Sequence, residues 1–242
     1  MSNDKRENAA LRLAGQGFAR LSPPDPTGGR HQALFLASSN PGKLREFRDA
    51  AAARGVLVEP LPGFAELPPC VEDGATFSEN AIKKAVYYSQ NVRGLVFADD
   101  SGICADALDG APGVYSARFA SEQATEAENN EKLLARIHRL ETQRRAETAR
   151  APRPHAIFNR AAHYVCVIAL AEAGCVRAVV EGRADGMIID EPRGTGGFGY
   201  DPFFFYPPLG KTFAEISPEA KFAVSHRGAA FRKLLDYLCM TA

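Results

Sequence analysis

The chain has 242 residues, of which 45% are hydrophobic and 24% charged, and its 29 basic and 29 acidic side chains give a formal net charge of zero. This length and hydrophobic content suit one large globular domain, or two lobes that share a core. Proteins that bind nucleic-acid polymers usually carry a basic excess, so the neutral balance does not favour such a partner. A small polyanion is compatible with it, because a metal ion can neutralise phosphate.

Cysteine usage and hydropathy indicate a reducing compartment and no membrane. An odd number of cysteines without C-x-x-C spacing predicts neither a zinc site nor a disulfide framework. No apolar stretch is long enough to cross a bilayer, and the N-terminus lacks the apolar core of a signal peptide. We therefore expect a cytoplasmic protein. The cysteines are Cys70, Cys104, Cys166, Cys175 and Cys239.

The N-terminal part of the chain predicts an extension followed by a strand, a tight loop and a helix. Residues 1–30 mix charge with Gly, Ser and Pro, so we expect a mobile extension ahead of a domain over residues 31–242. The apolar run 33–37 predicts a buried strand, and residues 43–54 have a helical periodicity that Gly55 ends. This order is a natural phosphate-binding arrangement, since the loop amides and the helix N-terminus point at a ligand above the strand.

The middle of the chain alternates strands and helices. Its two predicted helices open with capping boxes, which pair Thr76 with Glu79 and Thr125 with Glu128. Residues 142–160 are polar and Arg-rich and carry two prolines, so they predict an exposed loop. In order, the predicted elements are a strand over 56–61, a helix over about 76–90, a short buried strand over 95–98 and a helix over about 125–140.

The last third predicts an antiparallel hairpin and two helices. The hairpin turns at Glu172-Ala173-Gly174, and Ser217-Pro218-Glu219 is a helix start with proline at the first position. The order of elements predicts a mixed α/β domain around a partly antiparallel sheet. The predicted elements are strands over 163–171 and 176–182, a strand near 187–189, a glycine-rich loop over 193–200, a strand over 203–206 and helices beginning at 217 and 225.

The first candidate site is the predicted loop after the first strand. Its small residues let the backbone approach a phosphate, Asn40 can hydrogen-bond to it, and Lys43 supplies a point charge. It is not a Walker loop, which needs G-x-x-x-x-G-K-[ST]. Taken alone, the segment is equally compatible with an ordinary strand-to-helix turn that carries a solvated lysine. The loop consists of Ser38, Ser39, Asn40, Pro41, Gly42 and Lys43.

The second candidate site is Asp99-Asp100-Ser101-Gly102, which we expect directly at the end of the strand over 95–98. Two adjacent carboxylates at a strand end repel each other and lose hydration, so something must compensate for their charge. A hard divalent cation does this well, and magnesium at a phosphate is the usual case. Glu72 and Glu79 could complete its shell. Taken alone, the segment is also compatible with a turn in which the aspartates cap backbone amides.

The third candidate site is the glycine-rich run from Gly194 to Pro202. Four glycines in six positions, with two aromatic rings nearby, indicate a backbone that bends around something flat. Aromatic rings stack on bases, and an aspartate can accept hydrogen bonds from a base edge. The alternative is a hairpin loop whose rings belong to the core. Lys221 and the run Ser225-His226-Arg227 place cations and a histidine near helix ends, where such residues are ordinarily solvated.

Taken together, these segments resemble the inosine triphosphate pyrophosphatase family, also known as the XTP/dITP diphosphatases or Ham1-like proteins. The resemblance spans about residues 33–238, and the long central block with the FGYDP and SHRG signatures in the same order is highly specific. The matching pieces are SSNPGK (38–43), FSENAIKKA (77–85), FADDSGICADALDGAPGVYSARFA (97–120), GTGGFGYDPFFF (194–205), GKTFAEISPEAK (210–221) and SHRGAA (225–230).

The resemblance implies an elongated two-lobed α/β fold with a central mixed β-sheet flanked by helices, an active-site cleft between the lobes, and a homodimer. It also implies Mg2+-dependent hydrolysis of non-standard purine nucleoside triphosphates (ITP, dITP and XTP) at the α-phosphate. The products would be the nucleoside monophosphate and pyrophosphate. Such an enzyme clears damaged purines from the nucleotide pool.

The resemblance also implies roles for individual residues. The loop from Ser38 to Lys43 and the side chain of Lys84 would bind the triphosphate. Asp100 would be the catalytic carboxylate and, with Glu72, a metal ligand, while Ser101 would touch the substrate. The base pocket, which in this family favours 6-keto purines, would consist of Phe198, Gly199, Tyr200, Asp201, Lys221, His226 and Arg227.

A mechanism follows as a hypothesis. Mg2+ would offset the charge on the leaving pyrophosphate, and the two lysines would add electrostatic stabilisation. Asp100 or Asp99 would orient and deprotonate the attacking water. Arg227 would donate to the 6-oxo group of a base stacked on Phe198, and would reject adenine because a 6-amino group presents a second donor.

The chain departs from the compact family pattern at its N-terminal extension, at the 142–160 insertion, at Phe222 and at Ile103. None of these positions is a proposed catalytic residue. Two other functions are compatible with the motifs: a pyrophosphatase for modified pyrimidines, as in the Maf-like proteins, and a nucleotide sensor without turnover. A panel of triphosphates distinguishes the first alternative from a purine triphosphate pyrophosphatase. An assay for released pyrophosphate distinguishes the second. A purely structural protein is not expected, since it has no use for so many glycine-rich polar loops.

Overall fold

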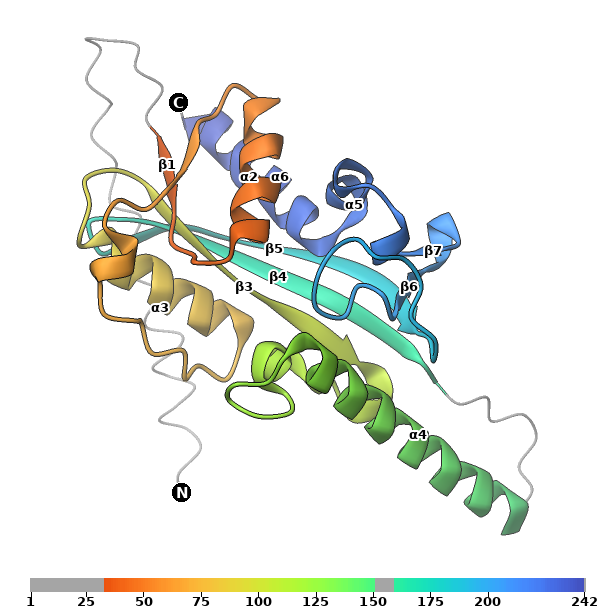
Figure 1. Ribbon diagram of the computed structural model, residues 1–242. Helices are drawn as coiled ribbons and strands as arrows, with labels where there is room; N and C mark the ends of the chain where they lie inside the picture. The colour runs from red at the N-terminus through yellow and green to blue at the C-terminus, as the bar shows by residue number, and fades with distance from the viewer. Residues whose placement is uncertain (1–32, 151–158, 242) are drawn as a thin grey trace. The chain divides into compact units, whose positions relative to one another are not determined.

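The computed structural model of the protein describes residues 33–150 and 159–241. The predicted extension at 1–30 and the predicted loop residues 151–158 lie outside this part. Within it, seven strands form a sheet in the order β2-β1-β3-β4-β5-β6-β7 (Figure 1). The strands are β1 (Leu34–Leu36), β2 (Val58–Pro60), β3 (Val96–Ala105), β4 (Ala161–Glu172), β5 (Cys175–Ile188), β6 (Phe204–Tyr206) and β7 (Lys211–Thr212).

The sheet is mixed, as predicted. β1 lies parallel to β2 and to β3, and the other neighbouring pairs are antiparallel. The long hairpin of β4 and β5 turns at Ala173 and Gly174, which have φ angles of 49° and 78°. The predictions of a mixed α/β class and of this hairpin are therefore confirmed. The two-lobed outline with a cleft between lobes stays a prediction.

Helices cover both faces of the sheet. α2, α5 and α6 lie on one face, and α3 lies on the other (Figure 1). The helices are α2 (Pro41–Ala52), α3 (Phe77–Ser89), α4 (Glu126–Arg150), α5 (Pro218–Val224) and α6 (His226–Thr241), with 3-10 turns η1 (Phe64–Glu66), η2 (Asp106–Leu108), η3 (Gly113–Arg118), η4 (Pro207–Leu209) and η5 (Phe213–Glu215).

β3 supplies side chains to the cores on both faces, because successive residues of a strand point to opposite sides. The Phe97 ring packs against Phe47 of α2 and Phe231 of α6, with centroid distances of 5.1 Å and 5.7 Å. Its neighbour Ala98 packs on the other face with Ala81 of α3. The same alternation continues into the next residues of β3, where the side chains are polar.

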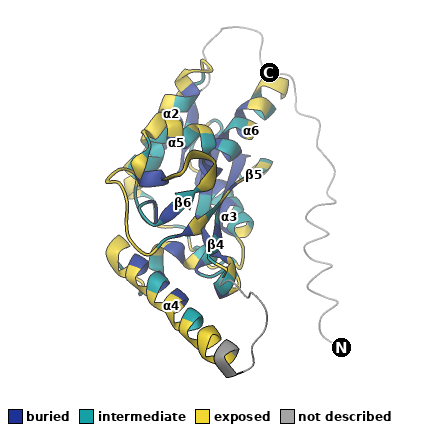
Figure 2. Cartoon of the chain, turned by 90° about the vertical axis from the view of Figure 1, so that its right-hand side faces the viewer, coloured by how far each residue is buried: buried dark blue, intermediate teal, exposed yellow. Residues whose placement is uncertain are grey.

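A further core lies where α4 meets the ends of β3 and β6. Leu133 and Ile137 of α4 are buried there with Ile103, Phe204 and Phe213. Asn129 and Asn130 of α4 are also buried, and most of the other described positions of the helix are exposed (Figure 2). α4 is thus an amphipathic helix that closes one end of the sheet.

Several predictions about element boundaries are wrong. The loop expected from residue 142 is helical up to residue 150, because α4 continues through a run of Arg, Gln, Glu and Ala, which are good helix formers. The strand expected near 187–189 is the end of β5, which stays paired with β4 up to Met187. The strand expected to end at residue 98 continues to Ala105, so Asp99 and Asp100 lie within β3 and not at its tip.

The helix expected from Lys43 begins two residues earlier. Pro41 occupies its first position, where its missing N–H costs nothing. Asn40 is the N-cap, and its side-chain oxygen accepts hydrogen bonds from the amides of Gly42 at 2.9 Å and Lys43 at 3.1 Å. The first turn of α2 is therefore held by Asn40 itself.

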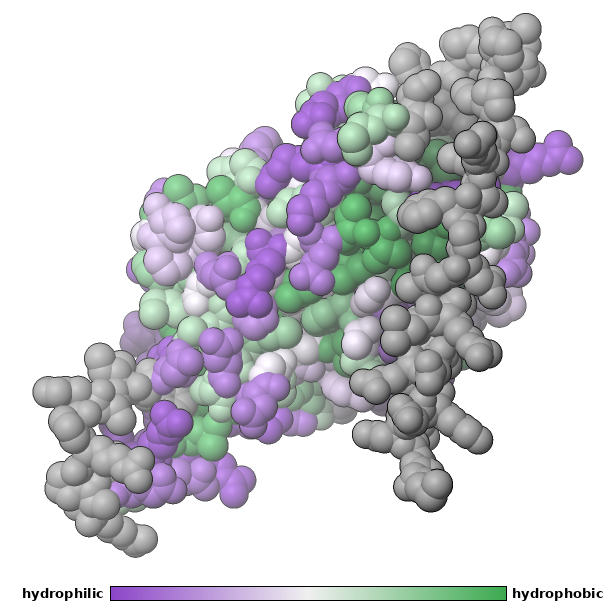
Figure 3. Space-filling view, turned by 180° about the vertical axis from the view of Figure 1, so that it is seen from behind, coloured by the Kyte–Doolittle hydropathy of each residue, from purple (hydrophilic) through white to green (hydrophobic). Residues whose placement is uncertain are grey.

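Part of the surface is hydrophobic. A green, hydrophobic area beside purple, hydrophilic residues is visible from behind (Figure 3). On β5, Val176, Val179 and Met187 are exposed, and Val179 pairs with Ala169, which packs under α3. α3 therefore leaves apolar side chains of β5 uncovered. No helix in the described part of the chain combines the length and hydropathy that a bilayer crossing requires.

Candidate active site

β3 has an open edge between Asp99 and Gly102. β1 stops pairing with it after Phe97, and the chain then leaves the sheet as the loop that leads into α2. Further along, the hydroxyl of Ser116 in η3 hydrogen-bonds to the backbone of Ile103. A cavity of about 800 Å³ opens where neither neighbour covers the strand. This gap explains how polar side chains from both faces of β3 reach one cavity.

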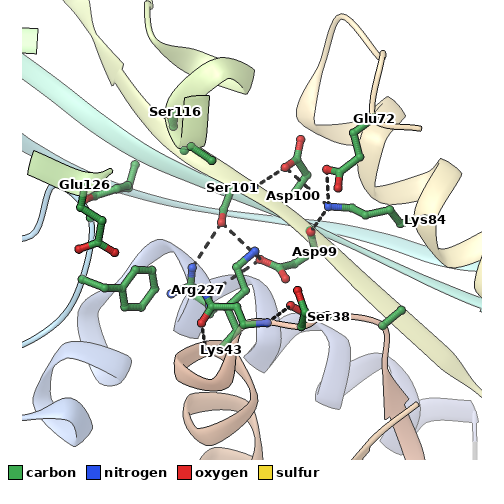
Figure 4. Close-up of a pocket in the computed structure, with 18 of the residues that line it drawn as sticks. Ser38, Lys43, Glu72, Lys84, Asp99, Asp100, Ser101, Ser116, Glu126 and Arg227 are labelled. Carbon is green, nitrogen blue, oxygen red and sulfur yellow. Dashed lines mark hydrogen bonds and ion pairs between the residues drawn. The ribbon is translucent and has the colours of Figure 1, made fainter. Parts of the chain in front are cut away.

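The cavity gathers nearly all of the predicted site residues. Pro41 and Gly42 do not line it, because they form the first turn of α2, and Glu79 instead accepts a hydrogen bond from the Ala75 amide at 2.7 Å. Figure 4 shows the arrangement around β3. The predicted residues that line the cavity are Ser38, Ser39, Asn40, Lys43, Glu72, Lys84, Asp99, Asp100, Ser101, Phe198, Gly199, Tyr200, Asp201, Lys221, His226 and Arg227.

Asp99 is fully buried and surrounded by cations. Its Oδ2 lies 2.8 Å from Lys43 Nζ and 3.9 Å from Arg227 Nε, and it accepts a hydrogen bond from the Ser101 hydroxyl at 3.3 Å. Burial alone would raise the pKa of Asp99, but Lys43 and Arg227 hold that pKa below its ordinary value. Asp99 is therefore a permanent anion that fixes two cations at the floor of the cavity.

Asp100 points to the opposite face of β3 and has a different environment. Its Oδ2 accepts a hydrogen bond from the Asn80 side chain at 3.0 Å, and its Oδ1 lies 3.8 Å from Lys84 Nζ. Burial raises the pKa of Asp100 above its ordinary value, and Lys84 and Asn80 only partly oppose this. The two adjacent carboxylates thus differ in basicity, and a pair separated in this way is typical of acid–base sites. Asp100 is the one suited to accept a proton.

Lys84 connects the second face of β3 with the loop before α3. Its Nζ lies 2.8 Å from Glu72 Oε2 and donates to the carbonyl oxygen of Asp99 at 2.7 Å. Burial alone would lower the pKa of Lys84, but Asp100, Asp99 and Glu72 together raise it. One ammonium group therefore contacts both carboxylates predicted to bind metal, Asp100 and Glu72.

The other end of the cavity is built around the Phe198 ring. Asp201 Oδ2 accepts a hydrogen bond from the Phe198 amide at 2.9 Å and forms an ion pair of 2.5 Å with Lys221 Nζ. Lys221 Nζ and Arg227 Cζ lie 4.5 Å and 5.2 Å from the centroid of the Phe198 ring. Asp201 thus holds the glycine-rich loop against α5, and the ring lies beside two cations.

His226 lies at this end as a neutral side chain. Its ring stacks on Tyr164 of β4 at a centroid distance of 4.5 Å and an interplanar angle of 7°. Burial lowers the pKa of His226 well below its ordinary value, and Arg227 and Lys221 lower it further. Its Nδ1 is buried and has no hydrogen-bond partner within the described residues. A ligand with a complementary polar group would satisfy this atom.

Tyr200 has a mainly structural role. Its ring is buried in the core between α4 and β6, and its hydroxyl donates to the Ser116 carbonyl at 2.8 Å. The alternative interpretation of the glycine-rich run, that its rings belong to the core, therefore holds for Tyr200. Phe198 is different, since it lines the cavity and is only half-buried.

Several residues that contact the predicted site residues were not predicted from the sequence. Glu46 of α2 lies 2.7 Å from Arg227 Nη1 and 3.4 Å from Lys221 Nζ, so it balances both cations. Asn80 contacts Asp100, and Tyr164 supports His226. The spacing of Glu46, one helical turn after Lys43, could have indicated that it faces the same side. No local sequence signal distinguishes Asn80 or Tyr164.

Known proteins with a similar sequence cover most of this chain. One is a dITP/XTP pyrophosphatase from Geobacillus kaustophilus (strain HTA426), 43% identical over 201 residues, which are 83% of this chain and 91% of that protein. Another is a dITP/XTP pyrophosphatase from Acidobacterium capsulatum, 47% identical over 214 residues, covering 85% of this chain and 97% of that protein.

Solved structures and a family model agree with these relatives. A HAM1 protein from Coxiella burnetii matches with a TM-score of 0.73 and 36% identity, over 86% of this chain and 99% of that chain. The Ham1 protein of Staphylococcus aureus matches with a TM-score of 0.71 and 34% identity, over 87% of this chain and 100% of that chain. The model of the Ham1 family matches residues 34–237, which include every described site residue. The chain therefore belongs to the Ham1 family.

Proposed function

We propose that this protein hydrolyses non-standard purine nucleoside triphosphates, namely ITP, dITP and XTP, to the nucleoside monophosphate and pyrophosphate. The observation that carries the proposal is that Lys43, Asp100 and Phe198 line one continuous cavity. This cavity offers a cationic wall for a polyphosphate, a carboxylate for the attacking water and an aromatic ring for a base. The relatives that share most of the chain are dITP/XTP pyrophosphatases.

In this proposal, the triphosphate lies along the loop before α2 and along β3. Lys43 is partly exposed to the cavity although it is paired with Asp99, so it can contact a phosphate while it keeps its place. Ser38, Ser39 and Ser101 offer hydroxyl groups on the same wall. Fixed cations of this kind stabilise the charge that develops on the leaving group.

Asp100 and Glu72 are proposed to hold Mg2+. Both carboxylates already contact one cation, the ammonium of Lys84, at 3.8 Å and 2.8 Å, so their positions fit a second cation shared between them. Among the described residues no three His, Cys, Asp or Glu side chains form a metal site. Two carboxylates suit Mg2+, which usually keeps waters and substrate phosphates as its other ligands. When bound, the ion would neutralise phosphate charge and orient the phosphates.

Asp100 is proposed to deprotonate the attacking water. Its partial exposure to the cavity favours this role over Asp99, whose carboxylate is buried and paired with Lys43 and Arg227. Asp99 would act by holding these two cations in place. Both residues would then be essential, for different reasons.

Base selection is proposed to occur at the Phe198 end. A purine stacked on Phe198 would bring its 6-oxo group toward Arg227, whose guanidinium only donates hydrogen bonds. Lys221 and His226 would contact the same edge, and Gly199 and Asp201 would shape the loop. Adenine would leave a donor facing a donor, which a buried site discriminates strongly.

The experiment that tests the proposal is a pyrophosphate-release assay over ITP, XTP, dITP, GTP and ATP, with and without Mg2+. Rapid release from the first three, dependent on Mg2+, is the expected result. Binding of ITP without release of pyrophosphate would indicate a nucleotide sensor without turnover. Release of orthophosphate would contradict cleavage at the α-phosphate. Modified pyrimidine triphosphates in the same panel test the Maf-like alternative.

The proposal extends to the assembly and its setting. The exposed Val176, Val179 and Met187 of β5 support a homodimer, since apolar side chains on a surface often mark an interface. The five cysteines are all free thiols, which supports the cytoplasm as the location. Residues 31–242 would form the catalytic domain, with residues 1–30 as an extension. Nucleic-acid polymers and membranes are not expected as partners.

A further inference from the structure

Asn80 of α3 bridges the two segments that carry the proposed metal ligands. Its side chain is 1% exposed and uses both of its polar atoms. The Nδ2 group donates to Asp100 Oδ2 at 3.0 Å, and Oδ1 accepts from the amide of Gly74 at 2.8 Å. Gly74 follows Glu72 by two residues. One buried amide thus connects the strand that carries Asp100 with the loop that carries Glu72.

The loop comes unusually close to the start of α3. A Cβ atom on Gly74 would lie 2.6 Å from Asn80 Oδ1 and 2.8 Å from Glu79 Cβ, distances that real contacts essentially never show. The next amide, that of Ala75, donates to Glu79 Oε2 at 2.7 Å. The loop is therefore docked on the first turn of α3, and glycine is required at position 74 for the docking.

We propose that Asn80 is a positioning residue that sets the separation and orientation of Asp100 and Glu72 for a divalent cation. Because Asn80 holds Oδ2 of Asp100, the other oxygen, Oδ1, is left on the side of Lys84, which also contacts Glu72. The same side-chain amide fixes the position of the loop that carries Glu72, because its oxygen accepts the hydrogen bond from the Gly74 amide. This inference rests on the proposed function, since it concerns the metal ligands of that site.

The expected size of the effect follows from the chemistry of outer-shell partners. Groups that orient metal ligands typically change metal affinity or activity by about 10–100-fold when they are removed. Asn80→Ala removes both hydrogen bonds. Gly74→Ala leaves the amide of Asn80 intact but pushes the loop away from it. Both variants should therefore weaken cation binding, although one changes Asn80 and the other changes the loop residue that Asn80 binds.

Direct binding of Mn2+ to the full chain without nucleotide tests the inference. Electron paramagnetic resonance of free Mn2+ gives the affinity, and thermal melting shows whether each variant is folded. Asn129→Ala is the matched control. Asn129 is 4% exposed and also bridges two backbone groups, the Ala120 amide at 2.8 Å and the Ala117 carbonyl at 3.1 Å, without contact to a carboxylate.

We expect Asn80→Ala and Gly74→Ala to bind Mn2+ about 10–100-fold more weakly and Asn129→Ala to bind it like the parent. Excess Mg2+ should restore ITP turnover in the first two, which a general loss of structure would not allow. Unchanged Mn2+ affinity in either folded variant, or weakening by Asn129→Ala of the same size, would overturn the inference. Absence of Mn2+ binding in the parent chain, with or without nucleotide, would instead refute the proposed metal site.

Discussion

Gly182→Ala should displace the start of α6 and impair both stability and base selection. Gly182 is buried in β5 beneath this helix, and a Cβ atom there would lie 2.1 Å from the His226 carbonyl oxygen and 2.4 Å from the Ala230 amide nitrogen. These are backbone atoms, so no side-chain rotation relieves the clash. Contacts below 3.0 Å essentially never occur. The distance between the new Cβ atom and the His226 carbonyl oxygen must therefore grow from 2.1 Å by at least 0.9 Å, which displaces the helix.

A shift of this size has two measurable consequences. Overpacking of a well-filled core costs about 1–3 kcal/mol, which lowers Tm by roughly 2–4 °C per kcal/mol for a chain of this size. Arg227 would also move relative to Glu46, from which it now lies 2.7 Å, so this contact would lengthen beyond hydrogen-bonding range. A misplacement of about 1 Å can cost about 100-fold in rate.

The assay combines thermal melting with steady-state hydrolysis of ITP and ATP. Glu181→Ala is the control, because Glu181 is the exposed neighbour of Gly182 on the opposite face of β5, and only its backbone carbonyl binds Lys233. It should leave Tm and kcat/KM near their original values. If Gly182→Ala melts and turns over like the parent chain, the close approach of β5 to α6 does not position the base pocket, and the reasoning is refuted.

The remaining predictions concern charges in the cavity. Asp100→Asn should reduce kcat for ITP by about 10²–10⁴-fold with an unchanged fold by circular dichroism, and near-normal turnover would remove Asp100 from the mechanism. Arg227→Ala should narrow the preference for ITP over ATP in kcat/KM, and an unchanged ratio would assign selection to another residue. Because the pKa of His226 is lowered in the folded chain, the unfolded chain binds an additional proton below about pH 6.5, so the free energy of unfolding should fall by roughly 1 kcal/mol between pH 7.5 and pH 5.5. Urea unfolding at pH 7.5 and 5.5 should show a smaller fall for His226→Gln, and an equal fall would show that other groups cause it.

Local signals predicted most elements of the fold correctly. The capping box of Thr125 and Glu128 forms as expected at the start of α4. At the start of α3 only half of the predicted box forms, because Thr76 accepts from the Glu79 amide while the Glu79 carboxylate accepts from the Ala75 amide. Ser217 caps α5 with Pro218 at its first position. The turn at Ala173 and Gly174 joins β4 and β5 as predicted. Such features depend on a few neighbouring residues, so they can be recognised without knowledge of the tertiary structure.

The errors arose where tertiary contacts override local composition. Polar residues at 99–101 resemble the end of a strand, yet β3 continues because β4 pairs with it over ten residues. Asn80 and Tyr164 act in the site through contacts with residues far away in the chain, Asp100 and His226. Such partners can be identified only when the elements are placed in three dimensions. Most of the residues predicted from the family motifs line one cavity, but the motifs did not predict the hydrogen bonds between them.

The shortness of β1 has a consequence for how this cavity could be altered. β1 ends at Leu36. On this edge of β3, the next backbone carbonyl is that of Asp99, and it accepts a hydrogen bond from Lys84 Nζ instead of from a backbone amide. Two more residues of β1 would let main-chain groups continue the ladder and would fill the space that a polyphosphate needs. The entrance is thus defined by where a strand stops. Insertions at this junction should abolish ligand entry even when every polar side chain is retained.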